Sequence, residues 1–271
     1  MKILKRICHS NVGTGGKREV LSPCWEKSGE KGTEKMSGKD YYIGTAKIYV
    51  AVDCIIFGFA EAELHLLLVK RMIEPAKGEW SLMGGFVQEE ESADEAARRV
   101  LKELTGLDKV YMEQVKAYTA VERDPGARVI SIAYYALMNI RDNDTALIQA
   151  HHACWVKMKD VPPLIFDHAD MVCQARELLK RKAATEPVGF QLLPKMFTLT
   201  QLQQLYEAVY GEVLDKRNFR KKVAEMGFVE KTGRVDKKTS KRGAALYRFN
   251  AHAYQKAPKF SIIANHIAHH S

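Results

Sequence analysis

Paired cysteines and long apolar segments are both missing from this sequence. Its five cysteines lie at irregular intervals with no Cys-x-x-Cys pair, which argues against a disulfide framework and against a thiolate zinc site. The longest apolar run, residues 48–60, contains Asp53 and is too short to cross a bilayer. The opening MKILKRICHS also lacks the apolar core of a signal peptide. We therefore expect a cytoplasmic protein that is neither secreted nor inserted in a membrane.

Acidic residues are scarce at the two ends of the chain. Of the 42 basic and 33 acidic residues, residues 1–35 carry 8 and 4, residues 36–185 carry 19 and 22, and residues 186–271 carry 15 and 7. A mildly acidic middle before a basic C-terminal part favours one module that need not contact a polyanion and one that binds it. A lysine-rich solvated surface would give the same balance. The length of 271 residues, 46% of them apolar, fits two modest domains.

Residues 1–35 show neither helical nor strand periodicity and are rich in Gly, Lys and Glu. Such a composition buries too little apolar surface to offset the entropy lost on folding. We expect residues 1–42 to be a disordered extension, with Met36 as the natural start of the protein.

The middle of the chain alternates strand-like and helix-like segments. A helix is expected to begin after the N-cap Ser92 and to end at Gly106, and a second amphipathic helix is expected at 168–182. Pro187 and its small neighbours then interrupt the periodicity, so we expect an α/β domain at 43–183. Apolar, β-branched residues predict strands at 48–59, 64–71, 80–87, 110–121, 128–139 and 153–158.

Residues 85–107, GFVQEEESADEAARRVLKELTGL, have the spacing of the Nudix box, G-x5-E-x7-R-E-U-x-E-E-x-G-U, where U is a bulky aliphatic residue. This part of the chain therefore resembles the Nudix family, and the resemblance implies an α/β/α sandwich with a mixed sheet. It also implies that Glu91 and Arg99 form a structural pair that shapes the loop. The residues that match the box are Gly85, Glu91, Arg99, Leu101, Glu103, Gly106 and Leu107.

Two positions of the box depart from the family pattern. In active members three carboxylates on the helix hold Mg²⁺ against a diphosphate, and Val100 and Leu104 occupy two of those positions here. Positions 100, 103 and 104 share one helical face, so only Glu103 remains to bind a cation that requires oxygen ligands. Replacement ligands could come from Glu89, Glu90 or Glu95, but their places in the loop and first turn favour structural roles. We expect no metal, no cofactor and no enzymatic activity.

A domain that has lost its chemistry can still bind a ligand in its cleft. The segment ERDPGARVISIAYYAL, residues 122–137, resembles those of Nudix domains that act on ADP-ribose and of related regulators, in which it lies near the ligand. Structural turns or interstrand salt bridges are the alternative roles for its charged residues, and Trp80 is equally consistent with a core position. The predicted effector-binding residues are Arg71, Glu79, Trp80, Glu122, Arg123, Asp124 and Arg128.

The C-terminal part reads as helix, basic helix and basic hairpin. Residues 197–211 carry a capping box at Thr198 and Gln201 and end at Gly211, so they predict a scaffold helix. The next helix follows Asp215 and buries Phe219, while its cations face outward. Two strands then flank the loop GRVDKKTSKRGA. This order predicts a small α+β winged helix-turn-helix domain at 190–260, followed by a tail at 261–271.

A helix of this kind fits the major groove of double-stranded DNA, and a cationic hairpin can reach the neighbouring backbone. Asn218 is alternatively the cap of its own helix, and RNA or an acidic protein is an alternative partner. The tail contains three His at irregular spacing, and we assign no metal site to it. The predicted base-reading residues are Arg217, Asn218 and Arg220, and the other predicted DNA contacts are Lys216, Lys221, Lys237, Lys238, Lys241 and Arg242.

The combination of DKRNFRKKV and KRGAALYRF with a degenerate Nudix box resembles the bacterial Nudix-type transcription regulators over residues 43–260. One branch represses NAD metabolism and responds to ADP-ribose-like nucleotides. The other regulates arabinose use in Bacteroides-like bacteria and responds to the sugar, and IIFGF, GEWSLMGGFVQ and LTGL look nearer to it. The resemblance implies a homodimer, an operator with two-fold symmetry and a small effector such as L-arabinose or an ADP-ribose-like nucleotide. The alternative function is a Nudix hydrolase of ADP-ribose or another nucleoside diphosphate compound.

Overall fold

A computed structural model describes residues 44–107, 109–140, 145–237 and 243–256 of the chain. The predicted N-terminal extension and the tail lie outside these ranges, as do three predicted DNA contacts, Lys238, Lys241 and Arg242. Contacts divide the chain into residues 1–46 and residues 47–271, and every helix and strand below belongs to the second unit.

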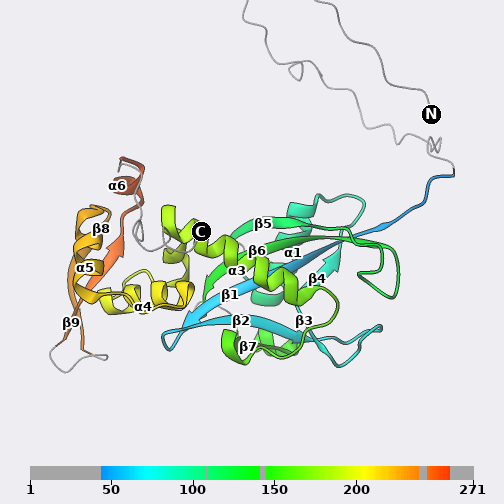
Figure 1. The fold of residues 1–271 in the computed structure, drawn as a ribbon, viewed down its shortest axis with the longest axis horizontal. Helices are drawn as coiled ribbons and strands as arrows, with labels where there is room; N and C mark the ends of the chain where they lie inside the picture. The colour runs from blue at the N-terminus through cyan, green and yellow to red at the C-terminus, as the bar shows by residue number, and fades with distance from the viewer. Residues whose placement is uncertain (1–43, 108, 141–144, 238–242, 257–271) are drawn as a thin grey trace, which may run out of the picture. The chain divides into compact units, whose positions relative to one another are not determined.

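A mixed sheet forms the first part of this unit (Figure 1). Within the described ranges its strands follow the order β3-β2-β1-β6-β5, while β4 pairs with β1 and β7 pairs with β2. Strands β1 and β6 are parallel and the other pairs are antiparallel. The strands are β1 Tyr49–Ala60, β2 Glu63–Lys70, β3 Trp80–Ser81, β4 Met83–Phe86, β5 Tyr111–Tyr118, β6 Val129–Asn139 and β7 Ala153–Lys157.

Helices cover both faces of the sheet because successive side chains of a strand point to opposite sides. In β1, Val52 packs with α1 (Ala93–Thr105), whereas Phe57 packs with α3 (His168–Thr185). A short helix, α2 (Thr145–Ala150), was not predicted from the sequence. None of the described helices is long and apolar enough to span a membrane. The arrangement is the predicted α/β/α sandwich with a mixed sheet.

The expected strand at 80–87 is two strands in the structure. The ladder is interrupted at Leu82, whose backbone N–H donates to Nδ1 of His168 at 3.1 Å. The prediction of one continuous strand is therefore wrong, because a side chain from a distant helix takes the backbone donor that a ladder would use.

The C-terminal part has the predicted order of helix, helix and hairpin. Both sides of the capping box at Thr198 and Gln201 are made, and Gly211 ends the first helix in the left-handed region at φ 77°. Asp215 caps the second helix and accepts the Asn218 backbone N–H at 2.8 Å. Asn218 is therefore not the cap of its own helix. The elements are α4 Leu199–Tyr210, α5 Lys216–Glu225, β8 Val229–Asp236, β9 Ala244–Phe249 and α6 Ala251–Lys256.

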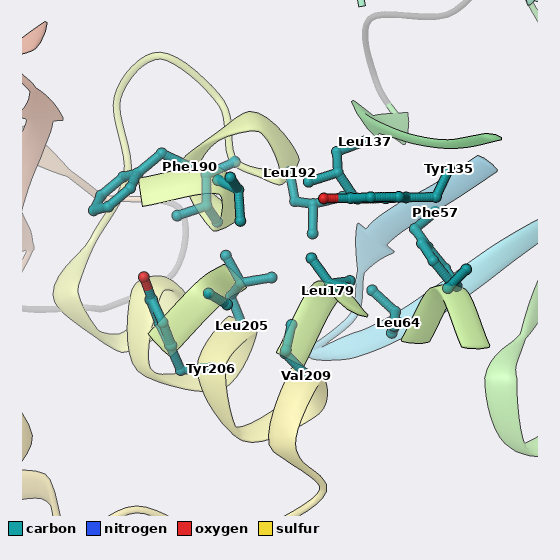
Figure 2. Close-up of a cluster of buried hydrophobic side chains, with 14 of the residues drawn as sticks. Phe57, Leu64, Tyr135, Leu137, Leu179, Phe190, Leu192, Leu205, Tyr206 and Val209 are labelled. Carbon is teal, nitrogen blue, oxygen red and sulfur yellow. The ribbon is translucent and has the colours of Figure 1, made fainter. Parts of the chain in front are cut away.

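One apolar cluster continues from the sheet into these helices (Figure 2). Between α3 and α4 lies a 3₁₀ helix, Pro187–Leu192, whose Phe190 and Leu192 are buried in the cluster. Leu179 of α3 and Leu205 of α4 belong to the same cluster. The cluster members drawn and labelled in Figure 2 are Phe57, Leu64, Tyr135, Leu137, Leu179, Phe190, Leu192, Leu205, Tyr206 and Val209.

Candidate functional site

The loop before α1 is held by the ion pair that the Nudix resemblance implies. Nη2 and Nε of Arg99 donate to the two carboxylate oxygens of Glu91 at 2.6 and 3.0 Å, and Nη2 also donates to the Phe86 carbonyl at 3.2 Å. The hydrogen bonds from Arg99 lower the pKa of the Glu91 carboxyl. Charge-assisted pairs of this geometry fix a loop against the helix that follows it.

Helix α1 lacks two of the three carboxylates that bind the metal in active Nudix enzymes. Val100 and Leu104 are 2% and 0% exposed and lie in the apolar cluster under α1, while Glu103 is exposed and lies 3.6 Å from Arg99. Of the three positions that share this face, only Glu103 is exposed, and the other two side chains belong to the core. Among the described residues no three His, Cys, Asp or Glu side chains are grouped as metal ligands. These residues do not fit the Mg²⁺ that active Nudix enzymes bind.

A cavity of about 300 Å³ lies among the strands next to this helix; no residue of α1 lines it, but Gly85 does, and a Cβ on Gly85 would lie 3.1 Å from Val100 Cγ2. Its walls come from β1, the end of β2, the β3–β4 segment, the loop between β5 and β6, and the start of α3. Gly84 lets β4 approach β1 at this point, because a Cβ there would overlap Asp53 Oδ1 and lie 2.7 Å from the Val52 carbonyl. Polar or charged side chains in the lining are Asp53, Lys70, Arg71, Ser81, Arg123, Asp124, His151 and His168.

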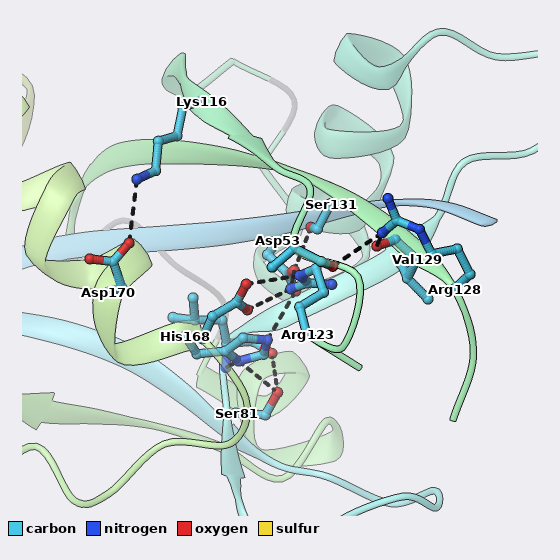
Figure 3. Close-up of polar contacts among 12 residues, drawn as sticks. Asp53, Ser81, Lys116, Arg123, Arg128, Val129, Ser131, His168 and Asp170 are labelled. Carbon is cyan, nitrogen blue, oxygen red and sulfur yellow. Dashed lines mark hydrogen bonds and ion pairs between the residues drawn. The ribbon is translucent and has the colours of Figure 1, made fainter. Parts of the chain in front are cut away.

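A buried polar network forms the cavity floor (Figure 3). Asp53 accepts the Ser131 hydroxyl at 2.5 Å and lies 3.5 Å from Nη2 of Arg123. Arg123 also donates to both carboxylate oxygens of Asp167, at 2.9 and 2.7 Å. Because Nδ1 of His168 accepts the Leu82 N–H, its Nε2 carries the proton, and Nε2 lies 3.6 Å from Asp53. Burial lowers the pKa of His168, which keeps the ring neutral.

Arg71 lies at the edge of the cavity without an acidic partner among the described residues. Its Nε donates to the Pro75 carbonyl at 2.7 Å, and its guanidinium lies 5.5 Å from the centre of the Phe166 ring. A cation held by a backbone carbonyl and an aromatic ring is available to an anionic ligand.

Three of the seven predicted effector-binding residues line the cavity, namely Arg71, Arg123 and Asp124. The other four, Glu79, Trp80, Glu122 and Arg128, do not line it. The Lys70 ammonium lies over the Trp80 ring, 4.2 Å from the ring centroid. Arg128 donates to the Thr119 and Ala120 carbonyls and so holds the loop between β5 and β6.

Asp53, Phe166 and His168 also line the cavity, and none of them was predicted from the sequence. An acidic residue inside an otherwise apolar strand was a visible signal for Asp53. No local pattern marks Phe166 or His168, because their significance depends on where α3 packs.

The predicted DNA surface lies on α5. Phe219 and Val223 are buried on its inner side. Lys237 is exposed at the end of β8, while Lys238, Lys241 and Arg242 lie outside the described residues. A groove runs between Arg220, the N-terminal turn of α4 and the start of β9, and it includes Thr200 and Gln204, which were not predicted. The outer side of α5 presents five exposed polar residues, and the four cations among them form no ion pair within the described ranges. These residues are Lys216, Arg217, Asn218, Arg220 and Lys221.

Comparisons with known proteins cover both parts of the chain. A family model described as the NUDIX domain matches residues 47–175, and one described as the NrtR DNA-binding winged helix domain matches residues 189–249. The ADPR responsive transcriptional repressor NtrR of Acinetobacter baylyi is 36% identical over 209 residues, which are 76% of this chain and 83% of that protein. An ADP-ribose pyrophosphatase of Methanocaldococcus jannaschii is 33% identical over 126 residues, 46% of this chain and 74% of that enzyme.

Solved structures give the same result. NrtR of Shewanella oneidensis, in complex with a 27mer DNA, superimposes with a TM-score of 0.69 at 30% identity over 76% of this chain and 95% of that one. A MutT/nudix family protein of Enterococcus faecalis, 23% identical with a TM-score of 0.60, shares the fold. The expected relationship to Nudix-type repressors of NAD metabolism is confirmed, whereas none of these relatives is described as responding to a sugar. The chain belongs to the NrtR family of transcription regulators, in which a Nudix domain precedes a DNA-binding winged helix domain.

Proposed function

We propose that this protein is a transcriptional repressor whose Nudix domain binds ADP-ribose, or a nucleotide like it, in the cavity that Arg71 and Arg123 line. The Acinetobacter relative is described as an ADPR responsive repressor and the Methanocaldococcus relative as an ADP-ribose pyrophosphatase. The two names share one small molecule, although one protein regulates and the other cleaves. A sugar effector, the other alternative from the sequence, has no support from these relatives.

The observation that carries the proposal is a cavity that keeps its cations in a domain whose metal site is lost. Val100 and Leu104 remove two of the three carboxylates on which Nudix hydrolysis depends, yet the cavity, which Gly85 separates from Val100, keeps Arg71 and Arg123. Binding requires directed cations and a concave wall, whereas cleavage also requires the metal. The protein therefore binds its effector without cutting it.

The cavity has the chemistry of a nucleoside diphosphate site. Arg71 and Arg123 are planar guanidinium donors that suit phosphate oxygens. Met72, Ile73 and Phe86 line the same cavity and are 56%, 62% and 53% exposed, so they offer apolar surface to a base or a ribose. Two other predicted residues hold segments next to this site: the Glu79 carbonyl accepts the Arg71 backbone N–H at 3.0 Å, and Arg128 donates to the Thr119 and Ala120 carbonyls.

The effector domain comprises residues 43–183 and the DNA-binding domain residues 190–260. In the second domain, Arg217, Asn218 and Arg220 read base edges, while the lysines of α5 and the hairpin contact phosphates. The protein acts in the cytoplasm as a homodimer on an operator of matching two-fold symmetry. The basic excess of residues 186–271 supports the DNA role, since a polyanion attracts it at long range.

A fluorescence-anisotropy titration tests the regulator. The probe is duplex DNA from upstream of the gene's own operon, with scrambled duplex as the control, titrated with no ligand, with ADP-ribose and with L-arabinose. We expect specific binding that weakens steeply with salt, and an affinity that ADP-ribose changes and arabinose does not. Equal binding to both duplexes contradicts the DNA role, and an unchanged affinity with ADP-ribose contradicts the effector.

Hydrolysis is the second candidate, favoured by the pyrophosphatase relative. Incubation with ADP-ribose and Mg²⁺ followed by chromatography for AMP tests it. We expect no release beyond that of a protein-free control. Release that requires Mg²⁺ and disappears in Glu103→Ala would replace the regulator-only assignment.

A further inference from the structure

Arg123 is the charged centre of the cavity floor. Its side chain is 3% exposed, it lines the cavity, and both of its donors on one edge are used by Asp167 at 2.7 and 2.9 Å. Asp53 lies farther away, at 3.5 Å. Asp167 is therefore the group that holds Arg123 in this structure.

Asp167 occupies the N-cap of α3 but does not cap it. The N-caps of α1, α4 and α5 are Ser92, Thr198 and Asp215, which have extended backbones with ψ of 163°, 155° and 118°, and each accepts a backbone N–H. Asp167 has ψ of 14° and no side-chain capping bond. Aspartate is a favoured N-cap, so its carboxylate is diverted from the helix to Arg123.

The residues on either side of Asp167 face the ligand space. Phe166 and His168 both line the cavity. Phe166 has φ of 51°, in the left-handed region that a bulky non-glycine residue rarely adopts. Three consecutive residues at the start of α3 thus combine a strained backbone, an unused cap and contact with the cavity, which are features of a segment with two arrangements.

The other end of α3 packs on the winged helix. The Tyr210 hydroxyl of α4 donates to the Lys180 carbonyl at 3.1 Å, and Leu179 lies in one buried cluster with Leu205 and Val209 of α4 (Figure 2). A single helix therefore connects the cavity with the scaffold of the DNA-binding domain.

We infer that Arg123 exchanges partners when the effector binds: its guanidinium leaves Asp167 for the phosphate oxygens of the ligand, and Asp167 turns to cap α3. This inference rests on the proposed function, since it requires an anionic effector in the cavity. The lost ion pair is offset by a new ion pair with the ligand and by a capping bond to the first turn. The protein therefore binds the effector with different affinities when Asp167 pairs with Arg123 and when Asp167 caps α3. Such a difference in affinity is required for an effector to shift the equilibrium between two arrangements.

Asp167→Asn and Asp167→Ala separate the two roles of the side chain. Asparagine caps a helix as well as aspartate does but has no negative charge to pair with Arg123. Alanine can neither cap the helix nor pair with Arg123. We expect both variants to bind ADP-ribose about tenfold more tightly, a typical size for coupling between sites. Without ligand, the Asn variant should bind operator DNA with the affinity of wild type saturated with ADP-ribose. The Ala variant should keep the ligand-free DNA affinity whether or not ADP-ribose is present.

Asp170→Asn is the matched control. Asp170 lies three residues along the same helix and pairs with Lys116 at 3.4 Å on the exposed side, apart from the network around Arg123 (Figure 3). This variant should keep both affinities. If Asp167→Asn behaves like Asp170→Asn, or binds ADP-ribose more weakly than wild type, the partner exchange is wrong.

Hydrogen exchange on the unmodified protein provides a test that needs no variant. Capping should slow exchange of the amides of residues 169 and 170 when ADP-ribose saturates the protein, by several-fold relative to the ligand-free state, whereas the Met171 amide already donates to the Asp167 carbonyl at 3.1 Å. A wild-type protein that binds ADP-ribose and changes its DNA affinity without slower exchange there contradicts the inference alone. A wild-type protein that does not bind ADP-ribose contradicts the proposed function as well.

Discussion

Asp53 is a buried carboxylate in the middle of an otherwise apolar strand, 8% exposed and close to Arg123 and His168. Removing one member of a buried charged group leaves the others without compensation. We expect Asp53→Ala to lower the free energy of unfolding by about 3 kcal/mol in a urea titration. Asp160→Ala, at an exposed carboxylate, should change it by less than about 0.5 kcal/mol. A loss at Asp53 no larger than at Asp160 would show that the network contributes little to stability.

His168 makes stability depend on pH. Burial lowers its pKa from the ordinary 6.5, against the attraction of Asp53 and Asp167 and with the repulsion of Arg123 and Arg71. Between the two pKa values, the unfolded chain therefore binds a proton that the folded protein does not bind. The stability of the folded protein is greatest above pH 6.5, where His168 is neutral in both states, and it decreases as the pH falls toward the lowered pKa.

We expect wild type to lose more stability than His168→Asn between pH 7 and pH 5, because only the wild-type side chain titrates. Asparagine can still accept the Leu82 N–H but does not titrate. Urea unfolding at both pH values measures the difference. Parallel pH profiles for the two proteins would place the titration elsewhere.

At the scale of elements, helix ends were predictable and the cavity was not. Ser92 and Thr198 each form the capping box that the sequence signals, because both partners lie within four residues. The break at Leu82 depends instead on His168, 86 residues away. The Asp53–Ser131 bond spans 78 residues. Periodicity and caps report local energetics, whereas the floor of the cavity is created by the packing of α3 against the sheet.

Helix α1 now packs as a core helix, so its lost carboxylates cannot simply be restored. Val100→Glu combined with Leu104→Glu would place two carboxylates in an apolar cluster. We expect a loss of at least about 2 kcal/mol at each site at pH 7, measured by urea unfolding, and no gain of ADP-ribose cleavage. Glu103→Gln, at an exposed position of the same helix, should be nearly neutral. A stable double variant with Mg²⁺-dependent cleavage would show that the box had kept its geometry.

Helix α5 should divide its contacts between bases and phosphates. Arg217→Ala is expected to cost about 1–3 kcal/mol on operator DNA and much less on scrambled duplex. Lys221→Ala should weaken both by similar amounts and lower the salt slope of log K by about 1. Arg98→Ala, an exposed cation on α1, serves as the control in the same anisotropy titrations. Equal losses on both duplexes for Arg217→Ala would assign it to phosphates.

At the scale of the whole molecule, the Nudix and winged helix parts share one apolar cluster through α3, the 3₁₀ helix at Pro187–Leu192 and α4. Because the two parts differ in charge, they bind different partners. Because they share a core, a change that destabilises one part also destabilises the other. A regulator needs both properties, because the effector and the DNA bind at different places and must influence one another.

Tryptophan fluorescence can measure this coupling, because the winged helix part contains no tryptophan. Trp80 and Trp155 report on the Nudix part, and Trp25→Phe removes the remaining one. We expect Leu205→Ala on α4, where Leu205 is fully buried, to lower the fluorescence-detected free energy of unfolding by about 2–5 kcal/mol. Val213→Ala, at a side chain that is 93% exposed, should leave it unchanged. If Leu205→Ala shifts only the circular-dichroism transition and not the tryptophan transition, the two parts unfold separately, and a shared core would not explain communication between them.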